Sequence, residues 1–166
     1  LLMQMAEAGV RPNIVTYNTL ISKHQASGQL DRANALLESM RASGVRPDVV
    51  TYSSLIDGLS RSLRHRQAER LWCRMRELGI QPDAATYNIV VRMYVRTHQL
   101  RDARGAITDM AASGFVPSPA TYSPLLAAFG KEGDVHALVD VLAEMQRRGV
   151  ELDVRAMQAV ASATAA

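Results

Sequence analysis

The side chains best suited to catalysis or metal binding are few and scattered in this 166-residue sequence. Its four histidines lie 41, 33 and 38 residues apart, a spacing that fits neither one helix face nor a zinc-binding motif. Cys73 is the single cysteine, so it cannot form an internal disulfide, and we expect it to be buried as a small apolar side chain. The sequence has no Gly-rich phosphate loop and no GxSxG nucleophile motif. We therefore predict that the chain is not an enzyme and holds no metal or other cofactor.

Two sets of polar residues do recur at a fixed spacing. An Asn or Ser follows each of four Thr-Tyr pairs, at Asn18, Ser53, Asn88 and Ser123. A second set lies 30 residues further on, at Asp48, Asp83, Ser118 and Asp153. An Asn amide can donate and accept hydrogen bonds, a Ser hydroxyl does so with a smaller side chain, and an ionised Asp only accepts. Within each set the residues are 35 apart, which indicates a repeated unit.

The whole sequence follows this period of 35 residues. Glycine recurs at positions 9, 44, 79, 114 and 149, methionine at 5, 40, 75, 110 and 145, and proline at 12, 47, 82 and 117. Several residue types cannot stay in phase over four intervals by chance. The period divides the chain into four complete units, residues 14–48, 49–83, 84–118 and 119–153, with partial units at 1–13 and 154–166.

Each unit has the pattern of two helices joined by a short turn. In the first unit one apolar series ends at Ser27-Gly28, and a second runs from Leu30 to Met40 at helical spacing. Gly44 is placed to end the second helix in the left-handed conformation, and Asp48 is placed to cap the next first helix. Neither helix can bury its apolar side alone, so successive pairs must stack. The predicted fold is all-α, an α-solenoid of stacked helix-turn-helix pairs with four complete repeats and a partial repeat at each end.

These repeats resemble the pentatricopeptide repeat family in its 35-residue P class. The resemblance lies in the segments RPNIVTYNTLI, RPDVVTYSSLI, QPDAATYNIVV and VPSPATYSPLL, and it covers nearly the whole chain. It implies a right-handed superhelix that binds single-stranded RNA sequence-specifically in a mitochondrion or chloroplast. It also implies that each repeat reads one base with two or three side chains.

The resemblance assigns base-reading roles to the two polar sets. The implied pairs are Asn18 with Asp48, Ser53 with Asp83, Asn88 with Ser118, and Ser123 with Asp153. In that order the family pattern implies uracil, guanine, cytosine and guanine, or 5′-UGCG-3′. Small apolar residues are implied to sandwich each base, at Val15, Val50, Ala85 and Ala120, and the smaller alanines should grip less firmly. A plainer alternative is that the Asn and Ser residues are merely solvated and the Asp residues merely cap helices.

Two further features lead to structural expectations. The Tyr of each Thr-Tyr pair is expected to pack between helices rather than stack on a base, at Tyr17, Tyr52, Tyr87 and Tyr122. In the fourth unit Pro119 suits the first turn of a helix, but Pro124 falls in the second turn. Its missing N–H should kink that helix or delay its start and so displace Ser123.

Arginine accounts for 17 of the 19 basic residues, and its planar guanidinium suits phosphate and stacking contacts. The four units carry net charges of +1, +2, +2 and −3, so the fourth should hold phosphates least. Six arginines gather near the second helix of the second unit, at Arg61, Arg64, Arg66, Arg70, Arg74 and Arg76. They are candidates for phosphate contacts to structured RNA, with a solvated helix face and a surface for an acidic protein as alternatives.

Three functions remain open on this basis. The first is an adaptor that binds one organellar transcript by its bases and stabilises it, exposes it for translation or guides its processing. The second is a structural subunit of an organellar ribosome that contacts rRNA by shape and charge, among ribosomal or other ribonucleoprotein partners. The third is a protein-binding scaffold. Neither a membrane nor a small-molecule substrate is expected, and any targeting peptide is expected to lie outside this chain.

Overall fold

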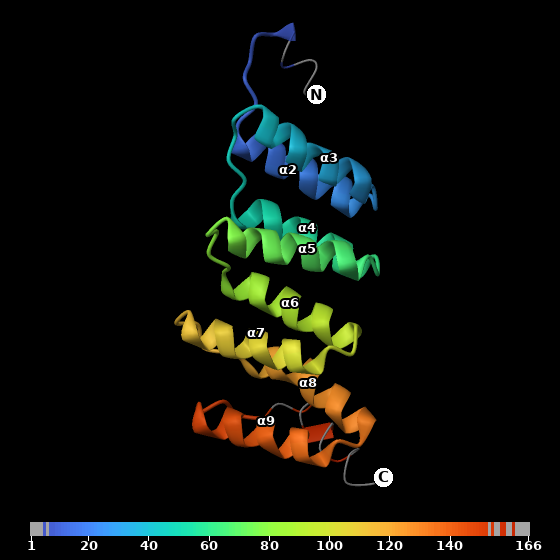
Figure 1. Cartoon of the computed structure of the whole chain (residues 1–166), viewed down its shortest axis with the longest axis vertical. Coiled ribbons are helices and arrows are strands. Elements are labelled where there is room, and N and C mark those ends of the chain that lie inside the picture. Colours follow the sequence, from blue (N-terminus) through green and yellow to red (C-terminus); the bar gives the residue numbers. More distant parts are fainter. Residues whose placement is uncertain (1–4, 6, 153, 155–156, 159–160, 162–166) are drawn as a thin grey trace. The chain divides into compact units, whose positions relative to one another are not determined.

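The computed structural model describes residues 5, 7–152, 154, 157, 158 and 161. In that part of the chain it contains eight helices and no strand (Figure 1). The helices form four pairs: α2 (Ile14–Ala26) with α3 (Leu30–Ala42), α4 (Val49–Arg61) with α5 (His65–Glu77), α6 (Ala84–Arg96) with α7 (Leu100–Ala112), and α8 (Pro119–Glu132) with α9 (Val135–Arg147). The predicted all-α fold of helix-turn-helix pairs is confirmed. The partial unit at 154–166 lies mostly outside the described residues.

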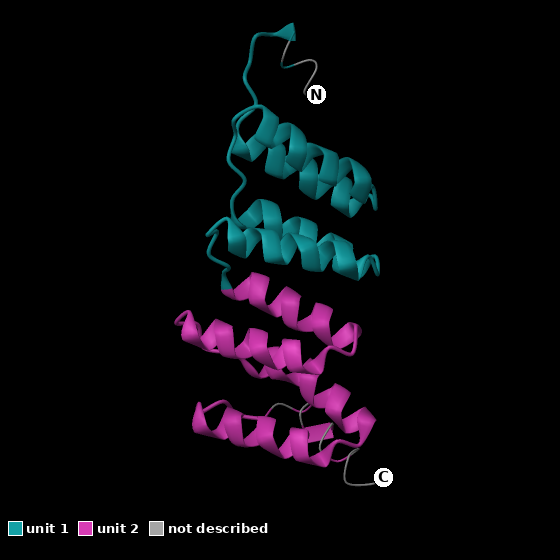
Figure 2. Cartoon of the chain, viewed as in Figure 1, with its two compact units in different colours: residues 1–83 teal, residues 84–166 magenta. Residues whose placement is uncertain are grey.

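The chain divides into two compact units, residues 1–83 and 84–166, each with two helix pairs (Figure 2). In the first unit α2 packs against α3, α4 packs against α5, and both α2 and α3 contact α4. In the second unit α6 packs against α7, α8 packs against α9, and α8 contacts both α6 and α7. Within each unit, stacking of the two pairs therefore buries the apolar sides of their helices.

The residue before the first helix of a pair fixes where that helix begins. Asp48 is extended, and its carboxylate accepts a hydrogen bond from the Thr51 backbone N–H at 2.9 Å. In return, the Thr51 hydroxyl accepts one from the Asp48 backbone N–H at 3.2 Å. Asn13 and Thr16 cap α2 by the same reciprocal arrangement. The predicted capping role of Asp48 is confirmed, and the period places such a cap at the start of α2 and of α4.

The end of the second helix is closed by glycine in the left-handed region. Gly44 has a φ of +75°. The next residue, Val45, donates its N–H to the carbonyl of Met40 at 3.0 Å, while Gly44 donates to Arg41 at 3.0 Å. These two bonds satisfy carbonyls that the helix leaves unpaired, and they turn the chain toward the cap of the next pair.

The tyrosines of the four Thr-Tyr pairs pack between helices, as predicted. Tyr17, Tyr52, Tyr87 and Tyr122 are all at most 5% exposed. The Tyr17 and Tyr87 hydroxyls each lie 3.0 Å from a serine hydroxyl just beyond the second helix of the same pair, that of Ser43 or of Ser113. Each of these two rings therefore fills the space inside its helix pair and also ties the end of the second helix to the first.

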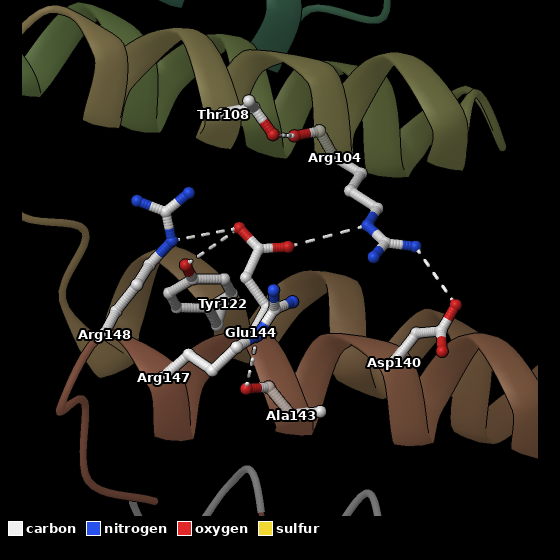
Figure 3. Close-up of polar contacts among 8 residues, drawn as sticks. All are labelled: Arg104, Thr108, Tyr122, Asp140, Ala143, Glu144, Arg147 and Arg148. Atoms are coloured by element: carbon white, nitrogen blue, oxygen red, sulfur yellow. Dashed lines mark hydrogen bonds and ion pairs between the residues drawn. The ribbon is translucent and has the colours of Figure 1, made fainter.

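In the second unit a nearly buried carboxylate joins three helices (Figure 3). Glu144 of α9 accepts a hydrogen bond from the Tyr122 hydroxyl of α8 at 3.4 Å. It also forms ion pairs with Arg148, at 3.2 Å, and with Arg104 of α7, at 3.6 Å. Arg104 reaches a second carboxylate, that of Asp140, at 3.5 Å. The network places two guanidinium groups around one carboxylate that water hardly reaches.

One structural expectation is wrong, and a second is wrong in part. Cys73 is exposed, because α5 buries Ala68, Trp72 and Met75, and the residue after Trp72 points about 100° away from that side. The start of α8 is not delayed by Pro124, since the helix runs from Pro119 to Glu132. The alternative expectation, a kink at Pro124, stays a prediction. Buried neighbours on either side of Pro124 hold the helix despite the hydrogen bond that the proline cannot make.

Candidate nucleic-acid interface

Each first helix carries an exposed apolar residue three positions before its Asn or Ser. In α2 these are Val15, which is 66% exposed, and Asn18, which is half-buried. Residues three apart lie on the same face of a helix, so the apolar and the polar side chain are neighbours. The corresponding apolar residues of α4, α6 and α8 are also exposed, at Val50, Ala85 and Ala120. An exposed Val beside a polar side chain suits a flat ligand that stacks on one and bonds to the other.

Asn18 and Asp48 are brought together although they lie 30 residues apart in the chain. The Asn18 Nδ2 donates to Asp48 Oδ1 at 3.2 Å. The hydroxyl of Thr51 donates to Asn18 Oδ1 at 2.6 Å. Both ends of the Asn18 amide are therefore held by the N-terminus of α4. We call Asn18 and Asp48 the first reading pair.

The Asp48 carboxylate stays charged in this setting. Burial acts to raise the pKa of Asp48, but the polar groups of Thr51 and Asn18 around the carboxylate together outweigh it and hold the pKa below 3.8. One of its oxygens, Oδ1, accepts hydrogen bonds from the Thr51 backbone N–H and the Asn18 Nδ2, and the Thr51 hydroxyl lies 2.9 Å from it. The first reading pair thus combines an amide N–H donor with an acceptor-only carboxylate.

The third reading pair, Asn88 and Ser118, has a related geometry in the second unit. The Thr121 hydroxyl donates to Asn88 Oδ1 at 2.7 Å. It accepts the N–H of Ser118 at 3.2 Å and lies 3.2 Å from the Ser118 hydroxyl. Asn88 is half-buried and Ser118 is exposed. Thr121 therefore connects the two members of this pair, which have no charged residue between them.

The structure describes the second pair, Ser53 and Asp83, and the fourth pair, Ser123 and Asp153, less completely. The Ser53 hydroxyl donates to the Val50 carbonyl at 3.2 Å in its own helix, and Asp83 is exposed at the end of the first unit. Ser123 is 7% exposed, and its hydroxyl donates to the Pro119 carbonyl at 2.8 Å. Its implied partner, Asp153, lies outside the described residues. The pairing of these residues stays a prediction.

Comparison with protein-family models decides the family. The model of the PPR repeat family matches residues 12–61 and 47–96, and a pentatricopeptide repeat-containing protein model matches residues 75–166. The chain belongs to the pentatricopeptide repeat family. The resemblance inferred from the four repeated segments is thus confirmed. No curated protein sequence matches the chain significantly.

Solved structures of other pentatricopeptide repeat proteins have the same fold. The crystal structure of PPR10 from maize aligns with a TM-score of 0.86 at 22% identity, over 98% of this chain and 23% of that one. PPR10 in complex with an 18-nucleotide psaJ RNA element aligns with a TM-score of 0.73 at 30% identity, over 94% and 23%. The PPR domain of Arabidopsis thaliana protein-only RNase P 1, in complex with tRNA, aligns with a TM-score of 0.83 at 20% identity, over 92% and 80%. The chain therefore spans about a quarter of PPR10.

The arginine cluster of this pentatricopeptide repeat chain is mostly engaged within the protein. Arg61 pairs with Asp57 at 2.7 Å, Arg64 with Asp31, and Arg74 with Glu77 at 3.2 Å. Arg76 lies over the Trp72 ring, 5.5 Å from its centroid. Arg66 and Arg70 are exposed, lie four residues apart on α5, and form no ion pair with a described residue.

Sequence reasoning missed the role of the threonines. Thr51 and Thr121 belong to the repeated Thr-Tyr pairs, and their hydroxyls contact the Asn of the preceding helix pair. The signal was available in the Thr-Tyr-Asn spacing, but only the structure shows that residues 33 apart meet. Among the described residues, no group of three or more His, Cys, Asp or Glu side chains could hold a metal ion. None of the described helices has the length and apolar character to cross a membrane.

Proposed function

We propose that this chain binds single-stranded RNA sequence-specifically, one base per repeat. The observation that carries the proposal is the first reading pair, in which Asn18 and Asp48 meet at 3.2 Å beside the exposed Val15. The similarity to PPR10 and to the RNase P domain, both solved with RNA, supports RNA as the ligand. The family pattern then gives 5′-UGCG-3′ as the preferred base sequence. The bound RNA would be a segment of an organellar transcript.

The chemistry of the exposed strip suits a base. The face of a base can stack on an apolar side chain, and each stacked base contributes on the order of 1 to 3 kcal/mol where the platform is aromatic. Valine is smaller than an aromatic ring and alanine is smaller still, so we expect the first two bases to be held more firmly than the last two. The edge of the base meets the amide, hydroxyl or carboxylate of the reading pair, where hydrogen bonds distinguish one base from another.

Selection from random RNA tests the proposal directly. We expect enrichment of UGCG in the wild type, and a shift from guanine to uracil at the second position alone in Ser53→Asn. Ser22→Asn is the matched control, because Ser22 is exposed on α2 outside the reading pairs and its substitution should leave every preference unchanged. A wild type that enriches no base at any position would refute base reading and favour the ribosomal or scaffold alternatives.

A second candidate function, phosphate binding on the exposed side of α5, is favoured by one observation. Arg66 and Arg70 are exposed without ion pairs to described residues, whereas Arg61 and Arg74 are neutralised by carboxylates. In this reading the chain grips folded RNA by charge, as a subunit of a ribonucleoprotein would. Arg66→Ala with Arg70→Ala should then weaken binding equally for all sequences and flatten its salt dependence. The double variant Arg61→Ala with Arg74→Ala is the control, and an equal effect in both would refute the assignment.

A further inference from the structure

We propose that the buried threonine at the third residue of α4 and of α8 is a positioning residue for the base reader of the preceding helix pair. This inference rests on the base-reading function proposed above. Thr51 and Thr121 are 0% and 2% exposed, so neither touches an RNA itself. Each acts through an Asn amide, at Asn18 and Asn88, by holding the oxygen of that amide away from the ligand.

The distances show which amide atom faces the threonine. The Thr51 hydroxyl lies 2.6 Å from Asn18 Oδ1, and the Thr121 hydroxyl lies 2.7 Å from Asn88 Oδ1. Bonds from a hydroxyl to an oxygen typically span about 2.7 to 2.8 Å, whereas bonds between a nitrogen and an oxygen span about 2.9 to 3.0 Å. The short distances fit a hydroxyl that donates to the amide carbonyl. The amide NH2 is thereby directed away from the threonine.

A proton count at Thr51 supports this orientation. A threonine hydroxyl has one proton to donate and two lone pairs to accept with. The Asp48 N–H occupies one lone pair, at 3.2 Å. Asp48 Oδ1 lies 2.9 Å from the hydroxyl but already accepts the Thr51 N–H and the Asn18 Nδ2. The proton therefore goes to Asn18 Oδ1, which is nearer and has no other donor among the described residues.

The two reading pairs differ in what holds the amide once the threonine is removed. At the first pair the Asp48 carboxylate accepts from Asn18 Nδ2 at 3.2 Å and would repel the amide oxygen, so it maintains the orientation alone. At the third pair the partner is the uncharged Ser118, and Asn88 Nδ2 has no hydrogen bond to a described residue. The Thr121 hydroxyl is the group that orients Asn88. The third pair therefore depends on its threonine and the first pair does not.

The orientation matters because cytosine and uracil are distinguished by it. At ring position 4 cytosine presents an amino donor and uracil a carbonyl acceptor. At N3 the roles are reversed, because cytosine accepts there and uracil donates its N3–H. An amide fixed with its NH2 toward the base offers a donor in both pairs, and the second member completes the match: Asp48 only accepts, as the uracil N3–H requires, whereas the Ser118 hydroxyl can donate to the cytosine N3. An amide free to rotate by 180° presents its oxygen as often as its NH2, because its two ends have nearly the same shape, and so no longer supports the choice that Ser118 makes. Loss of the threonine hydroxyl at the third pair should thus abolish the choice between the two pyrimidines.

Thr16 provides an internal control. It occupies the same position in α2, and its hydroxyl completes the same cap with Asn13, donating to Asn13 Oδ1 at 3.0 Å. No Asn of a preceding helix pair lies beside it in the described residues. Thr16→Val therefore removes the capping contribution without removing a contact to a reader.

The test measures RNA binding by the wild type and by three valine variants, Thr16→Val, Thr51→Val and Thr121→Val. The RNAs are variants of 5′-UGCG-3′ in which each position carries each of the four bases in turn. In Thr121→Val the preference for cytosine over uracil at the third position should fall by about 3- to 10-fold, the equivalent of one net hydrogen bond. The preferences at the first and second positions should change by less than about twofold. Thr51→Val should retain its uracil preference at the first position, and Thr16→Val should retain all preferences.

The outcomes separate this inference from the proposed function. A wild type without preference at any position contradicts base reading and the threonine role with it. A wild type that reads bases, with a Thr121→Val variant that keeps its cytosine preference, overturns the threonine role alone. An equal decline at every position would show that the substitution acts through the fold. Thr121→Ser, which keeps the hydroxyl, should restore the preference, and Thr121→Ala replaces the valine variant if that variant does not fold.

Discussion

Glu144 offers a direct test of how the second unit is held together, through the substitution Glu144→Gln. The carboxylate side chain is 10% exposed and links Tyr122 of α8, Arg104 of α7 and Arg148 at the end of α9 (Figure 3). Glutamine has nearly the same volume and keeps one carbonyl oxygen, so the substitution removes the charge with little change in packing. We expect it to lower the free energy of unfolding by about 1 to 2 kcal/mol.

This magnitude follows from the exposure of the partners. An ion pair at 3.2 Å has a gross attraction of about 5 kcal/mol at an effective dielectric constant of about 20, most of which is offset by the loss of hydration. Breaking a fully buried pair costs about 3 to 5 kcal/mol, because the remaining charge has no water. Here the side chains of Arg104 and Arg148 are 37% and 33% exposed, so both regain water when the carboxylate is neutralised. The cost is therefore well below that range.

Urea unfolding followed by circular dichroism measures the effect. Glu38→Gln is the matched control, since Glu38 pairs with Arg41 at 3.3 Å but is 70% exposed, and its loss should cost less than about 0.5 kcal/mol. A double-mutant cycle with Tyr122→Phe should show coupling of about 0.5 kcal/mol between the hydroxyl and the carboxylate. If Glu144→Gln unfolds at the wild-type urea concentration, or no more easily than Glu38→Gln, the reasoning from burial is wrong.

Three further predictions concern the backbone and one titrating group. Leu63 is 74% exposed at a φ of +60°, so Leu63→Gly should stabilise the chain by about 0.5 to 1 kcal/mol in chemical denaturation, and an unchanged midpoint would contradict strain at this turn. Gly105→Ala should raise the free energy of unfolding by up to about 1 kcal/mol, because its new Cβ meets no atom within 4 Å. Gly58→Ala should give no such gain, because its Cβ would lie 2.5 Å from Gln25 Cγ. Burial and then the Glu144 carboxylate raise the pKa of Tyr122 from 10.0 to about 12. In the unfolded chain the Tyr122 hydroxyl loses its proton near pH 10. The stability that comes from its raised pKa is therefore present below about pH 10 and is lost as the pH rises through 12. Tyr122→Phe should lessen this decline in unfolding curves measured at alkaline pH.

The helices could be predicted from the sequence because local chemistry sets their ends. Asp48 follows a proline and precedes an apolar series, and the structure has it as the cap of α4. Gly44 lies just after the last apolar residue of its series, and the structure has it at positive φ. These features depend on residues within one helical turn of each other. The same local signals return every 35 residues, so each helix pair reinforces the assignment of the next.

The contacts between helix pairs could not be predicted in the same way. The bond from Thr51 to Asn18 joins residues 33 apart and depends on the angle at which α4 packs against α2. No pattern in the sequence gives that angle. The prediction for Cys73 failed for another reason. Its residue type suggests burial, but its place on α5, one residue after the buried Trp72, makes it exposed. Pro124 also shows that burial of neighbouring residues can outweigh a local helix-breaking signal.

Capping and the proposed base reading at Asp48 are compatible. Asp48 Oδ1 accepts the Thr51 N–H at the start of α4 and the Asn18 Nδ2 from the preceding pair, so one atom serves both. The helix start fixes the carboxylate, and the carboxylate in turn fixes the amide. The residue that caps α4, Asp48, therefore also orients Asn18 of the preceding repeat, and no further residue is needed for this. A substitution of Asp48 should therefore change both the stability of the chain and the base preference proposed for the first pair.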